Sequence, residues 1–299
     1  MLNLAEALDA SGLPDGPLAV ISAGWQEAEA DIDDVREVTG RTLEDLRPYQ
    51  RANDVFKADE RLADAYRVRQ DRLKEQQQLY RQRLKQLALA ALQTLNADGD
   101  AEIVAAEQRH AIAQLRALDR HHLHRTESIH AEFDASFNSS SHSLLADQAR
   151  EMNEIIDRSA GVLITGGNIV VLLNRMRLFD LEASLADTHV AAWSAGAMVL
   201  AERIVLFHDR MPLGRRNPEI LGGGLGLAPG YVFLADVERR LRQRDRLHVG
   251  LMSRRFSPDV CVALDSGSQL LLEGERVDRA EATRRLSHDG RLTKLGAAA

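Results

Sequence analysis

Residues 161–167 read GVLITGG and residues 189–197 read HVAAWSAGA. In each stretch a short apolar run leads into a turn of small residues, and a segment with helical character follows. This pattern is typical of a buried parallel strand that ends in a tight turn before a helix. The repetition predicts an α/β fold of flavodoxin-like type, with a mostly parallel sheet covered by helices on both faces.

Further strands are predicted on either side of these two stretches. LAVISAG at 18–24 is expected to be the first strand, and the acidic segment WQEAEADIDDVREV after it favours a helix. Toward the C-terminus, LGLAPGYVFL at 225–234, VCVALDSG at 260–267 and QLLLEGERV at 269–277 are read as strands. The last two are expected to pair as a terminal hairpin.

Residues 53–137 have a different character. Tyr66, Leu73, Tyr80 and Leu87 recur every seven residues among Arg, Gln, Lys and Glu, which predicts a long helix with a narrow apolar seam. NADGD at 96–100 is expected to break it, with Asp100 as the N-cap of a second helix. The prediction is a coiled-coil-like antiparallel hairpin, 53–137, inserted into an α/β domain formed by residues 1–52 and 138–299.

Composition narrows the classes of function. The net charge is −7 and aromatic residues make up 4%, so neither nucleic acid nor an anionic membrane surface is an expected partner. The single cysteine, Cys261, lies in an apolar run and is expected to be a buried free thiol, as in a reducing compartment. No stretch is long and apolar enough to span a bilayer, and a cytoplasmic location is expected.

Ser194 lies at the corner between a predicted strand and a predicted helix. Such a corner exposes the serine hydroxyl, while the next backbone N–H points toward an oxyanion that develops during acyl transfer. Small residues are needed there because strand and helix nearly touch, and Ala192, Ala195 and Gly196 meet that need. Tight packing alone would also account for them, so these residues leave open whether Ser194 is a nucleophile.

Four motifs, in this order, resemble the peptidase E and cyanophycinase family of serine peptidases. They are ITGGN at 164–168, WSAGA at 193–197, HDRMPL at 208–213 and GLGLAPG at 224–230. The resemblance implies the class I glutamine amidotransferase-like fold. It covers roughly residues 18–40 and 142–275 and leaves out the helical hairpin.

The resemblance also implies roles for individual residues. Ser194 matches the nucleophile, and Asp209 lies near the acid that orients the catalytic histidine. The backbone N–H groups of Ala195 and Gly167 would form the oxyanion hole. Gly166 and Asn168, on either side of Gly167, would shape the pocket.

The family's histidine has no counterpart at its usual place. The segment GYVFLADVERRLRQRDRL at 230–247 contains no histidine, and serine without a base is a poor nucleophile at neutral pH. His208, next to Asp209, is the candidate replacement. His248, in the helical segment RLHVGLM, is expected to have a packing role.

The second long helix carries five histidines: His110, His121, His122, His124 and His130. His121 and His124 could face one metal ion, but cysteine partners and a general base are absent, so a solvated helix face is the favoured interpretation. No metal and no cofactor are expected.

Two hypotheses on function remain open. One is a serine hydrolase that acts on small or unusual peptides, with Ser194, His208 and Asp209 as catalytic residues. The other is an inactive relative that binds a protein partner through the hairpin, where Tyr66 and Tyr80 would lie on a thinly covered stripe. A homodimer would cover the same stripe.

Overall fold

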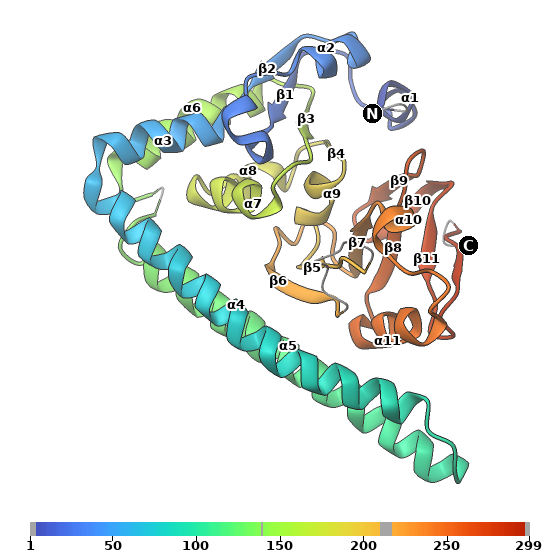
Figure 1. Ribbon diagram of the computed structural model, residues 1–299. Helices are drawn as coiled ribbons and strands as arrows, with labels where there is room; N and C mark the ends of the chain where they lie inside the picture. The colour runs from blue at the N-terminus through green and yellow to red at the C-terminus, as the bar shows by residue number, and fades with distance from the viewer. Residues whose placement is uncertain (1–3, 139, 210–216, 297–299) are drawn as a thin grey trace. The chain divides into compact units, whose positions relative to one another are not determined.

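The computed structural model describes residues 4–138, 140–209 and 217–296 (Figure 1). Arg210, Met211, Pro212 and Leu213 of the HDRMPL motif lie outside these residues. The contacts group the chain into two compact units. The first comprises Met1–Arg69 and His130–Leu200, and the second comprises Gln70–Ile129 and Ala201–Ala299.

The first unit contains a four-stranded, fully parallel sheet in the order β2-β1-β3-β4. The strands are β1 (Leu18–Ile21), β2 (Leu43–Asp45), β3 (Gly161–Ile164) and β4 (Val190–Ala192). Every residue of β1 and β3 is buried, as in strands covered on both faces. The predicted α/β class and the strands at 18–24, 161–167 and 189–193 are therefore confirmed.

Short helices surround this sheet. The segment after β1 begins as a 3-10 turn, η1 (Ala23–Ala28), and becomes helical at α2 (Asp33–Thr39). The other helices are α1 (Leu4–Ala10), α3 (Pro48–Ala58), α6 (Ser143–Asp157), α7 (Ile169–Leu178), α8 (Leu181–Leu185) and α9 (Ala195–Val199). The helices α7 and α9 follow the glycine turn and the Ser194 corner, respectively.

The long helices α4 (Glu60–Leu95) and α5 (Ala101–Asp134) form the expected hairpin and lie side by side (Figure 1). The Asp100 side chain accepts the backbone N–H groups of Glu102 and Ile103, which confirms the predicted cap. The first helix is not continuous from residue 53, because extended backbone at Asp59 separates α3 from α4. Both compact units contain parts of the hairpin; its prediction as a separate inserted domain stays a prediction.

The second unit contains a mixed sheet in the order β12-β11-β8-β7, in which β7 (Tyr231–Ala235) and β8 (Val260–Leu264) are parallel. The antiparallel pair β5–β6 also belongs to it. Other elements of this unit are β5 (Arg203–Leu206), β6 (Glu219–Gly223), β11 (Arg284–Leu286), β12 (Leu292–Lys294), α10 (Val237–Arg240) and α11 (Arg246–Phe256). Cys261, on β8, is a buried free thiol, as expected.

The predicted terminal hairpin is wrong in its pairing. Segment 269–277 does not pair with β8, whose neighbours are β7 and β11. Instead β9 (Gln269–Glu273) pairs with β10 (Arg276–Glu281) as a two-stranded ribbon. The turn falls inside the segment at Gly274, whose φ of +59° suits glycine.

The seam of the hairpin is buried within the second unit. Leu84 and Leu115 belong to the same apolar cluster as Phe207, Val232 and Leu234. Tyr80 is only 2% exposed, so the expected thinly covered stripe at this position is wrong. Its hydroxyl donates to Asp119 at 2.9 Å, and the Arg255 Nε donates to Asp119 at 2.7 Å, which ties both long helices to α11.

Two of the five helix histidines are buried, which corrects the expectation of a solvated face. His122 stacks on Tyr80 with ring centres 4.0 Å apart, and burial lowers the pKa of His122 to about 4. His130 is also buried, and its pKa is lowered to about 3 for the same reason. Among the described residues, no three His, Cys, Asp or Glu side chains gather as metal ligands would.

Across the described residues, no helix combines the length and apolarity that crossing a membrane requires.

Candidate active site

Ser194 occupies a strained corner between β4 and α9. Its φ of +54° and ψ of −121° place it in a region that residues with a Cβ seldom adopt. The residue is exposed, and Met198 N–H donates to the Ser194 carbonyl, so the helix begins at the corner itself. This local backbone presents the hydroxyl outward from the end of a parallel strand.

Glycines allow close approach around this corner. A Cβ at Gly196 would lie 2.2 Å from the carbonyl oxygen of Ile164, so only glycine lets α9 pack directly on the end of β3. A Cβ at Gly166 would lie 2.9 Å from the Ser194 Cβ and 3.1 Å from its Oγ. Gly166 therefore leaves room beside the hydroxyl.

The backbone N–H groups of Gly167 and Ala195 are the donors that the resemblance proposes for an oxyanion hole. Neither donates to an acceptor among the hydrogen bonds of the described residues. Gly167 has a φ of +101°, and a Cβ there would collide with the Gly24 carbonyl oxygen at 2.3 Å. Asn168 has an evident structural role, because its Oδ1 caps α7 by accepting the N–H groups of Val170 and Val171.

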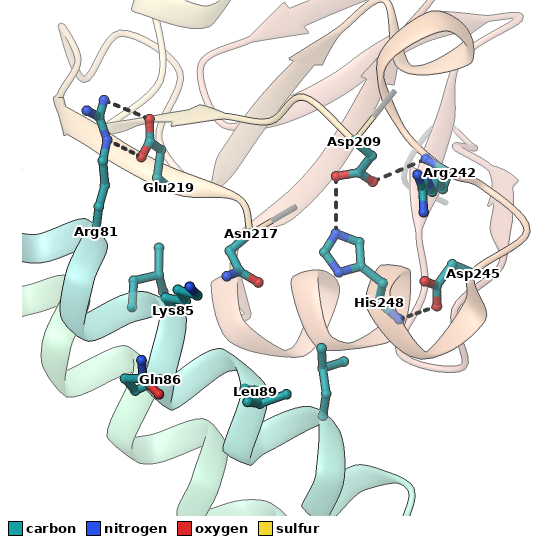
Figure 2. A pocket seen from close by; sticks show the side chains of 12 residues that line it. Arg81, Lys85, Gln86, Leu89, Asp209, Asn217, Glu219, Arg242, Asp245 and His248 are labelled. Carbon is teal, nitrogen blue, oxygen red and sulfur yellow. Dashed lines mark hydrogen bonds and ion pairs between the residues drawn. The ribbon is translucent and has the colours of Figure 1, made fainter. Parts of the chain in front are cut away.

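Within the second unit, Asp209 lies beside His248 (Figure 2). The His248 Nε2 and the Asp209 Oδ1 are 3.5 Å apart, and both side chains are more than nine-tenths buried. The other Asp209 oxygen accepts the backbone N–H of Arg242 at 3.2 Å. Asp245 caps α11 by accepting the N–H of His248, which fixes the start of the helix that carries the imidazole.

This pair differs from the one that the sequence suggested. His208, the residue before Asp209 in the sequence, is half-buried. The Asp209 carboxylate faces His248 on α11. The expected packing role of His248 is therefore incomplete, because its ring also meets a buried carboxylate. Asp245, three residues before His248, does indicate the start of a helix in the sequence. No local pattern, however, predicts that His248 on this helix contacts Asp209, which lies 39 residues earlier in a loop.

The sequence matches the family model of peptidase family S51 over residues 113–280, which is more than half of the chain. The chain therefore belongs to peptidase family S51, a family of peptidase E-like hydrolases. The match begins within α5, so it includes part of the hairpin that the resemblance left out, and it does not extend to residues 18–40. No curated protein matches the chain significantly.

Proposed function

We propose that this chain is a serine-type hydrolase of small or unusual peptides, with Ser194 as the nucleophile. The observation that carries the proposal is the backbone at Ser194, where positive φ holds an exposed hydroxyl at a strand–helix corner. A strained corner of this kind is the nucleophile elbow of α/β hydrolases. Membership of family S51 supports the same chemistry at the level of reaction class.

In the proposed reaction, the Ser194 Oγ attacks the carbonyl carbon of a peptide bond, and its proton passes to a base. The negative charge that develops on the carbonyl oxygen would be stabilised by the N–H groups of Ala195 and Gly167. Loss of one such donor typically costs about 100- to 1000-fold in rate. The base then gives this proton to the leaving amine as the C–N bond breaks, which leaves an acyl ester on Ser194 and a neutral base. Water attacks the ester carbonyl and gives a proton to the same base, and the proton returns to the Ser194 Oγ as the acid product leaves.

The base is proposed to be a histidine that acts with Asp209. His208 adjoins Asp209 in the sequence, and His248 adjoins it in space within the second unit. The proximity of a buried carboxylate favours His248, because a catalytic histidine is commonly oriented by a neighbouring carboxylate.

Labelling with a fluorophosphonate probe, followed by peptide mass spectrometry, tests the nucleophile. We expect wild-type protein to be labelled at Ser194 and Ser194→Ala to be unlabelled. Absence of labelling in wild-type protein that unfolds cooperatively would count against an activated serine and favour an inactive relative.

The same assay separates the two histidines. His248→Gln is expected to slow labelling by at least about 100-fold, with His208→Gln near the wild-type rate. The reverse ranking would return the role to His208, and unchanged rates in both variants would exclude this pair of candidates.

A further inference from the structure

The turn after β1 packs directly against the glycine turn after β3, within the first unit. The N–H of Asn168 donates to the Gly24 carbonyl oxygen at 2.7 Å. A Cβ on Gly24 would lie 2.3 Å from the Gly166 carbonyl oxygen, and a Cβ on Gly167 would lie 2.3 Å from the Gly24 carbonyl oxygen. Because there is no room for a side chain at these positions, the two turns pack backbone to backbone.

Trp25 is the first side chain beyond this backbone contact. Its Cδ1 atom lies 3.0 Å from the position of a Cβ on Gly167, so the indole ring lies against the residue whose N–H is a proposed oxyanion donor. The preceding glycine, Gly166, lies beside the nucleophile, because a Cβ there would be 3.1 Å from the Ser194 Oγ. Two consecutive glycines therefore connect the indole ring with the serine hydroxyl. Trp25 is half-buried, so part of its surface stays open to a ligand.

The backbone at Gln26, in the same turn, is strained in the same way as the backbone at Ser194. The φ and ψ angles are +59° and −119° at Gln26, and +54° and −121° at Ser194. Arg47 and Asp180 also have positive φ, but their ψ angles of 47° and 40° belong to the ordinary left-handed region. Strain of the rarer kind concentrates at active sites and ligand-binding turns. It therefore indicates, independently of the indole contact, that the β1 turn belongs to a functional site.

The other tryptophan of the chain adjoins the nucleophile. Trp193 precedes Ser194, is half-buried and packs against the same apolar cluster as Trp25. The strands β1 and β4 lie on either side of β3 in the sheet. The two turns that flank the glycine turn thus each contain an indole ring.

We infer that Trp25 is a specificity-determining residue of the Ser194 site and favours substrates with an aromatic side chain beside the scissile carbonyl. The inference rests on the proposed function, in which the Gly167 N–H binds the carbonyl oxygen. A carbonyl group bound there lies next to the indole, and an aromatic ring attached beside it can pack on that indole. Such aromatic pairs contribute binding energy beyond the area that they bury. Trp25 contacts the substrate side chain and takes no part in proton transfer.

Two sulfonyl fluorides that differ by one phenyl ring test this role. Phenylmethanesulfonyl fluoride and methanesulfonyl fluoride each form an S–O bond with an activated serine and release fluoride, while the hydroxyl proton passes to the base. Mass spectrometry gives the rate constant for modification of Ser194 by each reagent. The ratio of the two rate constants is compared between variants, because reagent reactivity and any general loss of active protein cancel in it.

Trp25→Ala should lower the ratio of phenylmethyl to methyl reagent roughly three- to tenfold, and Trp25→Phe should retain most of it. Leu144→Ala is the matched control. Leu144, on α6 of the same unit, is also a partly exposed apolar residue, at 37%. Its substitution should leave the ratio at the wild-type value.

A second measurement tests the aromatic contact without a reaction at Ser194. In full-length Ser194→Ala protein, the two tryptophans give two indole N–H signals in a ¹⁵N–¹H spectrum, and a further Trp25→Phe substitution assigns them. Titration with N-acetyl-L-phenylalaninamide should shift the Trp25 signal at roughly three- to tenfold lower concentration than titration with N-acetyl-L-alaninamide.

Three results would overturn the inference. They are an unchanged reagent ratio in Trp25→Ala, an equal fall of the ratio in Leu144→Ala, and a Trp25 signal that responds equally, or not at all, to the two amides. Failure of both reagents to modify Ser194, together with a Trp25 signal that prefers the aromatic amide, would overturn the proposed function and still support aromatic binding at Trp25. The two proposals are therefore distinguishable.

Discussion

Gly196 determines how closely α9 approaches the end of β3. Because a Cβ at this position would meet the Ile164 and Thr165 carbonyl oxygens at 2.2 and 2.6 Å, Gly196→Ala must displace the helix. We expect a loss of roughly 1–3 kcal/mol in the free energy of unfolding, measured by urea denaturation. Gly296→Ala is the matched control, since nothing lies within 4 Å of its Cβ. Equal stability of the two variants would contradict the close contact.

Burial of His122 makes the free energy of unfolding depend on pH, and it determines the direction of that dependence. Its pKa is about 4 in the folded protein and about 6.5 when exposed, so between these values only the unfolded chain takes up the proton. The free energy of unfolding should therefore fall as pH decreases from 6.5 to 4, by on the order of 3 kcal/mol from this group. His122→Phe retains the stack on Tyr80 and should lose this component.

The measurement is urea denaturation of the wild type and His122→Phe at several values between pH 4 and 7. His121→Gln, on the exposed neighbouring residue, serves as the control and should follow the wild type. If the wild type and His122→Phe lose stability in parallel over this range, the folded pKa of His122 is not lowered.

Among the elements, α4, α5 and α11 are joined by a buried polar network. The guanidinium of Arg255 contacts the Asp119 carboxylate and the Tyr80 hydroxyl, and all three residues are at most 3% exposed. Asp119→Ala leaves a buried cation without its counter-charge, so we expect a loss of about 3–5 kcal/mol in the free energy of unfolding.

Urea denaturation measures this loss, with Glu107→Ala as the control on the exposed face of the same helix. That substitution should change stability by no more than about 0.5 kcal/mol. A similar small effect of Asp119→Ala would mean that Arg255 is satisfied without the carboxylate.

Elements with a strong local pattern were predictable from the sequence. The seven-residue repeat and the Asp100 cap specify the hairpin, and apolar runs before small-residue turns specify β1, β3 and β4. The break at Asp59 was not predictable, because the surrounding residues favour helix on both sides. Nor was the pairing of β9, since the apolar alternation that defines a strand does not choose its neighbour.

The candidate site likewise has local features that the sequence predicts and long-range contacts that it does not. The corner at Ser194 and the glycine turn are local features, and small residues in the sequence reveal them. The contact of Asp209 with His248 joins two distant segments, and its residues carry no shared spacing that could be read beforehand. A similar limit applies to His122, whose burial depends on what packs against its helix face.

At the scale of the whole molecule, the chain passes between the two compact units at residues 69–70, 129–130 and 200–201. Neither unit is a continuous segment of sequence. Two of the three boundaries fall within the long helices α4 and α5, where the sequence shows no change in composition and no linker. This grouping follows from contacts between residues that are remote in the sequence, which local sequence patterns do not report.

Excising residues 70–129 distinguishes a dispensable insertion from an integral part of the second unit. A short glycine-serine turn can join Arg69 to His130, because the Arg69 guanidinium already lies 4.1 Å from the Phe133 ring centre. Tyr80, Leu84 and Leu115 share a core cluster with Val232 and Leu234, so the deletion should expose that core.

We expect the excised protein to lose amide protection in β7 and β8, measured by hydrogen exchange with mass spectrometry, and to bind a hydrophobic dye. Inserting five glycine and serine residues into the exposed turn at 96–100 is the control. It lengthens the hairpin at its exposed turn and should preserve protection, since insertions at exposed turns are generally tolerated. Protected β7 and β8 after excision would show instead that the hairpin is an independent insertion, because a strand pair that loses apolar neighbours from its core exchanges rapidly.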